Sequence, residues 1–169
     1  MTGDDVFPDR DMTHRAKIEF MLERQGWAMD AAPATADPPF PRYAYTVGFE
    51  DRFASPDICV FGLAPVACQG LFALVADALD GGTALPVGAP FIGLLEDEQP
   101  CALLPVDPAD ATGLFPSLAE HQRLAGRAVD QLRVLQLVWP DPEGRLPWEP
   151  GFADALAPLQ LLVGEPPAS

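Results

Sequence analysis

Two strand-like segments that follow each other closely restrict the fold more than any other feature of this sequence. Residues 43–49 (YAYTVGF) are rich in aromatic and β-branched side chains, and residues 57–63 (DICVFGL) are apolar on both faces. Only seven residues separate the two segments, which is too few for a helical crossover between parallel strands. We therefore expect an antiparallel pair whose second strand lies in the interior of a sheet.

Helical patterns alternate with strand patterns along the chain. The segment before Gly26 has apolar residues three and four positions apart and follows two candidate caps, Asp11 and Thr13. Residues 66–79 contain almost no strongly polar side chain, which predicts a helix buried over most of its circumference. We expect four helices. The first ends at about residue 25, the second spans residues 66–79, the third spans residues 108–126 with interruptions near Gly113 and Pro116, and the fourth spans residues 152–157.

The remaining strands and loops complete the expected sheet. Residues 132–139 alternate as a final strong strand, a short strand begins at Trp27, and two short strands flank the acidic turn at residues 96–98. Four prolines in residues 31–42 predict an extended loop, and residues 50–56 predict a turn.

These patterns predict a single α+β domain, a mainly antiparallel sheet with helices packed on it. We expect this domain to span residues 11–163, with a flexible lead-in at residues 1–10 and a tail at residues 164–169. A chain of 169 residues is long enough to bury a core of its own.

The charge of the chain restricts its partners. Ten basic and twenty-five acidic residues give a net charge of −15, and the basic residues are scattered. Nucleic acid and anionic membranes are therefore poor partners, whereas a basic protein or a cationic small molecule fits well. The acidity can also serve solubility alone. No apolar run is long enough to span a bilayer and the N-terminus lacks an apolar core, so we expect a cytoplasmic protein.

The cysteines and histidines predict no metal or disulfide site. Cys59, Cys68 and Cys101 show no CxxC spacing and lie among apolar neighbours, as small core residues do. His14 and His121 are far apart in the sequence, so no metal-ligand pattern exists. We also find no P-loop, GxGxxG, GxSxG or HExxH motif, and we expect no cofactor.

Five short motifs occur in a fixed order along the chain: Tyr45-Thr46-Val47-Gly48, Pro56-Asp57, Gly62-Leu63, Trp139-Pro140-Asp141 and Pro147-Trp148. Together they resemble the bacterial family catalogued as domain of unknown function 4262. The resemblance covers about residues 26–162, and one position departs from the family pattern, since Ser55 stands where the family often has histidine. The resemblance implies the identity of the domain but no activity.

The segment from Gln136 to Phe152 is the most specific stretch of the sequence. It contains two tryptophans, four prolines and two glycines. One interpretation is a rigid corner in which Asp141 accepts N–H bonds within a turn. The other is a ligand wall, in which Trp139 and Trp148 flank Asp141 or Glu149 and bind a cationic group.

A second group of candidate ligand-binding residues lies in and beside the two adjoining strands. Tyr45 and Thr46 place polar groups on opposite faces of the first strand, and Asp57 begins the second. The simplest interpretation of the unit Ser55-Pro56-Asp57 is a turn, or a cap at the start of the strand. Tyr45, Asp57, His121 and Asp141 could converge in space, but their spacing does not decide whether they do.

These observations support two functions. The first is a non-catalytic binding or interaction domain for a cationic partner, of the kind that immunity-type or accessory proteins provide. The alternative is a small enzyme or ligand-binding domain with its pocket at the corner formed by Trp139, Pro140, Asp141 and Trp148. A deep pocket that held Tyr45, Asp57 and Asp141 together would favour the alternative.

Overall fold

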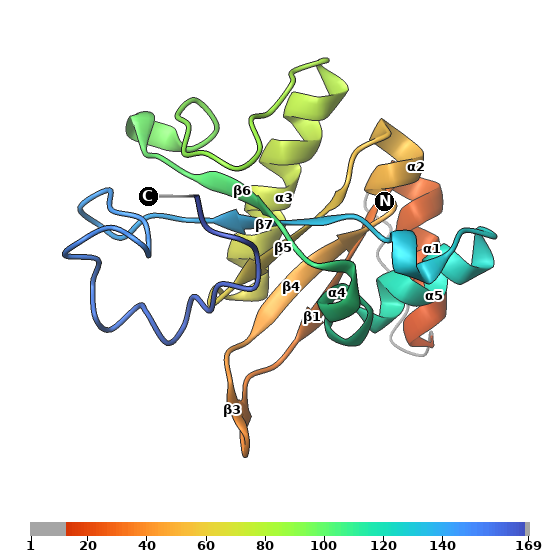
Figure 1. Ribbon diagram of the computed structural model, residues 1–169. Helices are drawn as coiled ribbons and strands as arrows, with labels where there is room; N and C mark the ends of the chain where they lie inside the picture. Colours follow the sequence, from red (N-terminus) through yellow and green to blue (C-terminus); the bar gives the residue numbers. More distant parts are fainter. Residues whose placement is uncertain (1–12, 168–169) are drawn as a thin grey trace, which may run out of the picture.

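The computed structural model describes residues 13–167, and a five-stranded sheet runs through its centre (Figure 1). The strand order is β1-β4-β5-β7-β6, in which β5 and β7 run parallel and the other neighbouring pairs run antiparallel. This arrangement confirms the α+β prediction. The strands of the sheet are β1 (Ala28–Ala32), β4 (Tyr43–Val47), β5 (Asp57–Phe61), β6 (Ala102–Pro105) and β7 (Val134–Val138). The helices are α1 (His14–Gln25), α2 (Phe49–Phe53), α3 (Pro65–Asp80), α4 (Pro108–Leu114) and α5 (Pro116–Leu124), with short 3-10 turns at Glu96–Glu98 and Val129–Gln131.

Helices cover both faces of the sheet, and each face has its own apolar core. On one face, Phe72 and Val75 of α3 pack in a cluster with Ile58 of β5. On the other face, α1, α4 and α5 form a second cluster with the sheet (Figure 1). A smaller third cluster lies where the C-terminal segment packs near the β6 edge, and it includes Leu146 and the partly buried Trp148. The central strand β5 is thus buried on both sides, as its sequence predicts.

The link between β4 and β5 differs from the predicted turn, because it contains the short helix α2. Gly48 precedes α2 with a φ of 106°, a conformation that favours glycine. A side chain at this position would also lie 3.0 Å from the carbonyl oxygen of Gly26 and closer still to Leu22. Glu50 and Asp51 occupy the first turn of α2, where the helix dipole favours negative charge. Both negative charges lie close enough to Asp57, the first residue of β5, to act on its carboxyl group.

Helix α3 is less buried than the sequence predicts. Cys68, Phe72, Val75 and Ala76 form its buried stripe, while Leu74 is 41% exposed and residue 66, a valine, is 86% exposed. The prediction of burial over most of the circumference is wrong because the helix packs on one face of the sheet and, among the described residues, leaves its other side partly exposed. Among residues 13–167, no helix combines the length and the apolar content that crossing a membrane requires.

Three loop regions also differ from prediction. Residues 31–42 are no plain loop, because β1 extends to Ala32 and β2 (Thr35–Ala36) pairs with β3 (Pro39–Phe40). The strand expected before residues 96–98 is reduced to one bridge between Phe91 and Cys101. Residues 152–157 form turns and no helix.

Residues near both ends of the described segment contact the body of the fold. Thr13 caps α1 by accepting the N–H of Ala16, whereas Asp11 and the lead-in at residues 1–10 lie outside the described residues. At the other end, Gly164 bridges to Val106, so the first part of the expected tail lies against the sheet.

Candidate functional site

The carboxylate of Asp57 is the best candidate for a functional group in this fold. Asp57 is the first residue of β5 and is only 2% exposed. Its Oδ1 accepts a hydrogen bond of 2.7 Å from the hydroxyl of Thr46 and one of 2.9 Å from the backbone N–H of Phe49. The hydroxyl oxygen of Thr46 in turn accepts the N–H of Ile58 at 2.9 Å. Two predicted site residues, Thr46 and Asp57, are therefore in direct contact.

The second carboxylate oxygen of Asp57 is available to a ligand. Within residues 13–167, no hydrogen bond reaches Oδ2, and Asp57 lines a polar cavity of about 300 Å³. Among the described residues, Oδ2 of Asp57 is not one of the fully enclosed side-chain atoms that lack a partner, so it is accessible from the cavity. The other residues that line the cavity are Glu50, Gln122, Arg127, Gln131, Leu132 and Arg133.

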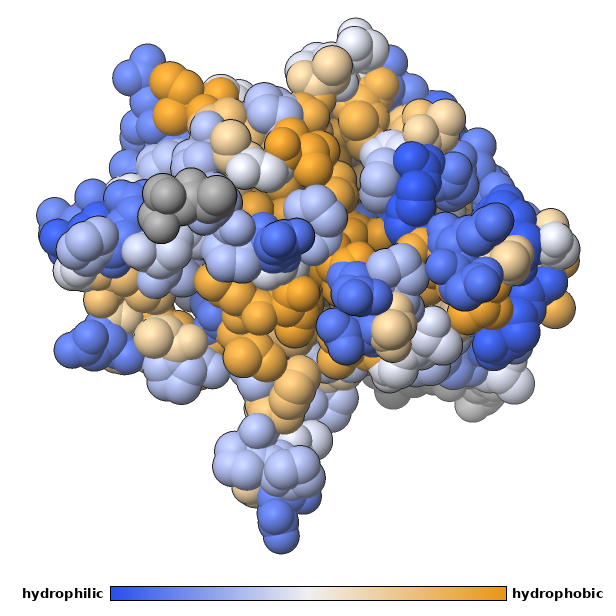
Figure 2. Space-filling view, in the orientation of Figure 1, coloured by the Kyte–Doolittle hydropathy of each residue, from blue (hydrophilic) through white to orange (hydrophobic). Residues whose placement is uncertain are grey.

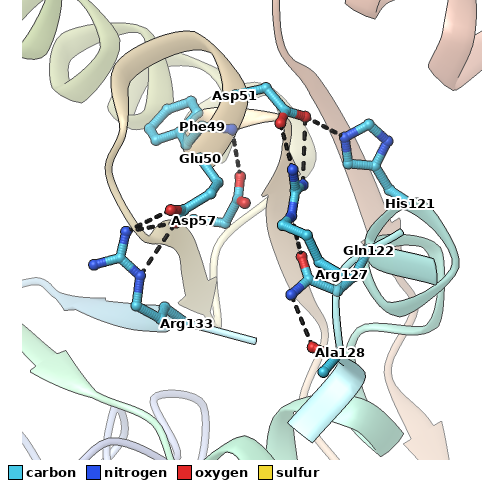
Figure 3. Close-up of polar contacts among 9 residues, drawn as sticks. All are labelled: Phe49, Glu50, Asp51, Asp57, His121, Gln122, Arg127, Ala128 and Arg133. Atoms are coloured by element: carbon cyan, nitrogen blue, oxygen red, sulfur yellow. Dashed lines mark hydrogen bonds and ion pairs between the residues drawn. The ribbon is translucent and has the colours of Figure 1, made fainter. Parts of the chain in front are cut away.

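Ion pairs between α2 and two arginines form the rim of this cavity (Figure 3). The guanidinium of Arg133 donates to both carboxylate oxygens of Glu50, with the shortest distance at 2.6 Å. Asp51 accepts from Arg127 at 2.7 Å, and its other oxygen lies 2.7 Å from Nε2 of His121. The two guanidinium charges are thus balanced by carboxylates of α2, and within the described part of the chain the carboxylate of Asp57 forms no ion pair.

The surroundings of Asp57 shift its protonation toward neutral pH. Burial, with a smaller contribution from the negative charges of Glu50 and Asp51, raises the pKa of Asp57 to about 7, against the hydrogen bonds from Phe49 and Thr46. In contrast, the guanidinium of Arg127 holds the pKa of Asp51 below its ordinary value. A cation placed at Oδ2 would favour the ionised form of Asp57, because it would supply the missing opposite charge.

Asp141, the central residue of the predicted corner, has no comparable free oxygen. Its Oδ1 accepts the N–H groups of Glu143 and Arg145 at 2.9 and 2.8 Å. Its Oδ2 accepts the N–H of Ala153 at 3.1 Å and the side chain of Arg145 at 3.3 Å. Asp141 therefore holds its own turn together, in the way that the structural interpretation of this corner describes.

The other corner residues also make internal contacts. The indole N–H of Trp139 donates to the carbonyl of Phe61 at 2.8 Å, and its ring belongs to the core beneath α3. Trp148 packs in the separate C-terminal cluster, so the two indoles do not clamp a common space. Glu149 accepts the N–H of Leu146 at 3.2 Å.

Tyr45 lies at a different place, beside Asp30 and Ser117. Its hydroxyl donates to Asp30 at 2.8 Å and accepts the N–H of Ser117 at 3.1 Å. The hydroxyl of Ser117 also donates to Asp30, and Nε2 of His14 lies 3.0 Å from the same carboxylate. This set is no Ser-His-Asp triad, because the same imidazole nitrogen faces both the serine and the aspartate.

The four residues whose convergence the sequence left undecided therefore occupy three places. Asp57 lines the polar cavity, and His121 reaches its rim through Asp51. Tyr45 and Asp141 lie in separate hydrogen-bond networks. Sequence reasoning missed the residues of the rim, Glu50, Asp51, Arg127 and Arg133. The acidic pair after Gly48 was a usable signal, but nothing in the sequence linked it to arginines more than seventy residues away.

Comparisons with known proteins give one match. The family model described as "Domain of unknown function (DUF4262)" matches residues 21–153, which include every residue of the cavity. No curated protein and no solved structure matches the chain.

Proposed function

Because the chain belongs to the family described as domain of unknown function 4262, which carries no stated activity, we propose a function from the site alone. We infer that the protein is a non-catalytic binding domain that receives a cationic group in the cavity beside Asp57. The observation that carries this proposal is the buried carboxylate whose Oδ2 has no hydrogen-bond partner among the described residues.

Charge and geometry together favour a cation at this position. Both arginines of the cavity wall are already paired with carboxylates, so neither leaves an uncompensated positive charge for an anion. The two hydrogen bonds that Asp57 accepts among the described residues, by contrast, both come from neutral donors. An ammonium or guanidinium group at Oδ2 would gain a charge-assisted hydrogen bond in a site that is already desolvated.

The size of the cavity limits the ligand. About 300 Å³ is at the lower end of the range for small-molecule pockets. It accommodates a small amine or the end of one lysine or arginine side chain from a basic protein. The net charge of −15 would attract either of these, and it disfavours nucleic acid. We place this binding function in the bacterial cytoplasm, where buried free cysteines such as Cys59 stay reduced.

The corner at Trp139, Asp141 and Trp148 gives less support to an enzyme or ligand pocket. The carboxylate of Asp141 is fully used within its turn, and Trp139 is only 8% exposed. The central acid of the corner, Asp141, is therefore not free to meet a substrate.

An NMR titration tests the proposal. Nα-acetyl-lysine amide is added to the wild type, to Asp57→Asn and to Asp154→Asn, an exposed acid that serves as the control for net charge. We expect the amide signals of Phe49 and Ile58 to move in the wild type and the control, because both are tied to the Asp57 network. In Asp57→Asn the affinity should fall about tenfold or more. Equal shifts in all three proteins, or no shift at any probe concentration, would refute a cation site at Asp57.

A further inference from the structure

A narrow two-stranded arm projects from the body of the molecule (Figure 1). It is formed by β2 and β3, in which Thr35 pairs with Phe40 and Ala36 pairs with Pro39, so that residues 37 and 38 form the tip. The hydroxyl of Thr35 donates to the carbonyl of Pro38 at 2.8 Å and closes the turn. Residues 33–39 are exposed along this arm.

The base of the arm is fixed to the body by aromatic contacts. The ring of Phe40 lies 5.9 Å from that of Tyr43 and 6.1 Å from that of Phe61, in edge-to-face arrangements. In Figure 2 the arm has a hydrophilic tip and a more apolar base. A fixed base gives the tip a defined position relative to the sheet, as a recognition element requires.

The charges of the arm are placed at its two ends. In residues 31–42, Asp37 at the tip and Arg42 at the base are the only charged residues, and both are exposed. Neither forms an ion pair with another residue of the segment 13–167. Arg42 lies at a hollow of about 470 Å³ on the body, which is lined mostly by alanine, proline and leucine. The other arm residues are mostly small, so another chain can approach them closely.

We propose that two copies of this chain associate through their arms, which lie side by side in opposite directions, so that each Asp37 contacts Arg42 of the second copy. A two-fold axis across the arms places the tip of each arm at the base of the other, and the same contact then forms twice. The distance along the arm from residue 37 to residue 42 is about 17 Å, at about 3.3 Å per residue, and it is the same in both copies. A parallel arrangement would instead place like charges together.

The size of the arm sets the strength of this contact. About ten residues per copy is half or less of the roughly 20–30 residues per partner in a standard interface. Each copy also carries a net charge of −15, which opposes association at long range. We therefore expect a weak, reversible dimer with a dissociation constant on the order of micromolar to hundreds of micromolar.

Sedimentation equilibrium from about 10 µM to about 1 mM tests the proposal, since this range covers the expected dissociation constant. The wild type should dimerise, and Arg42→Glu and Asp37→Arg should each weaken the dimer about tenfold or more, because each homodimer then contains two like-charge contacts. Arg123→Glu on α5 changes the net charge by −2, as Arg42→Glu does, but away from the arm, and it should leave the dimer unchanged. Circular dichroism verifies that each variant is folded.

The decisive sample is an equimolar mixture of Arg42→Glu and Asp37→Arg. In a heterodimer of these two variants, both contacts again join opposite charges, so association should return to near the wild-type level. A wild type that stays monomeric at the highest concentration would overturn the proposal. So would dimers that persist in both single variants, or a mixture that shows no recovery.

Discussion

The carboxyl group of Asp57 is expected to make the stability of the protein depend on pH. Its pKa is about 7 in the folded protein and about 4 in an unfolded chain. Below about pH 4 both states hold the proton, whereas between about pH 4 and 7 only the folded state does. As the pH rises from about 4 to 7, the wild type should therefore lose up to about 1.4 kcal/mol of unfolding free energy per pH unit, relative to Asp57→Asn.

Urea unfolding of both proteins at pH 4, 5.5 and 7.5 measures this difference. Comparison with Asp57→Asn cancels the titration of the other groups, because asparagine keeps an oxygen for the N–H of Phe49 but has no proton to lose. Parallel pH dependences in the two proteins would show that Asp57 ionises in the folded state as it does in water.

Asp141 is expected to show the opposite pH dependence. Burial tends to raise the pKa of Asp141, but the N–H groups of Arg145, Ala153 and Glu143 outweigh this effect and hold the pKa below its ordinary value. The stability that its ionised form provides is present above about pH 4 and is lost as the pH falls through the folded-state pKa. Asp141→Asn should therefore lower the melting temperature at neutral pH. Both carboxylate oxygens of Asp141 accept N–H groups, so the N–H₂ of asparagine would face N–H donors in either orientation of the amide. The difference should shrink in acid, and Glu143→Gln serves as the neighbouring control. A variant that melts like the wild type at pH 7 would contradict this account of the turn.

At the scale of elements, helix α3 should tolerate change on one face only. Phe72 is fully buried in the core beneath α3, whereas Leu74 lies two residues away on the outer side. Phe72→Ala should cost about 3–5 kcal/mol of unfolding free energy. Leu74→Asp should stay within about 0.5 kcal/mol of the wild type. Chemical denaturation measures both, and a large cost at Leu74 would mean that something covers the outer face of α3.

The two tryptophans of the C-terminal corner should also differ in how much unfolding free energy their replacement costs, because one is more buried than the other. Trp139 is 8% exposed and has a hydrogen-bonded indole N–H, so Trp139→Ala should cost about 3–5 kcal/mol. Trp148 is only partly buried, and Trp148→Ala should cost about half of that or less. Unfolding curves of the two variants test this order, and the reverse order would contradict the burial of Trp139.

Local patterns predicted the elements with strong periodicity, and tertiary contacts decided the rest. Strands β4, β5 and β7 and the two interrupted helices α4 and α5 are where the sequence predicted them. The burial of α3 was predicted wrongly, because an apolar sequence does not reveal how many sides of a helix have neighbours. The arm at residues 33–42 was missed because proline-rich strands of two residues lack a recognisable alternation.

At the scale of the whole molecule, the candidate site was only partly predictable. The bond between Thr46 and Asp57 joins residues eleven apart on adjacent strands, within reach of a sequence argument. The pair between Glu50 and Arg133 joins residues 83 apart, and the pair between Asp51 and His121 joins residues 70 apart. Such pairs depend on how β7 and α5 return to the start of β5, which no local pattern specifies. The cavity is therefore a property of the assembled fold.

The most direct test of a cation site at Asp57 is the NMR titration of its own side-chain carboxyl carbon against pH. In the free protein we expect a midpoint near 7. Saturating Nα-acetyl-lysine amide should move this midpoint downward, because a cation at Oδ2 favours the ionised carboxylate. A midpoint near 4 in the free protein, or a midpoint that the amine does not move, would contradict the account.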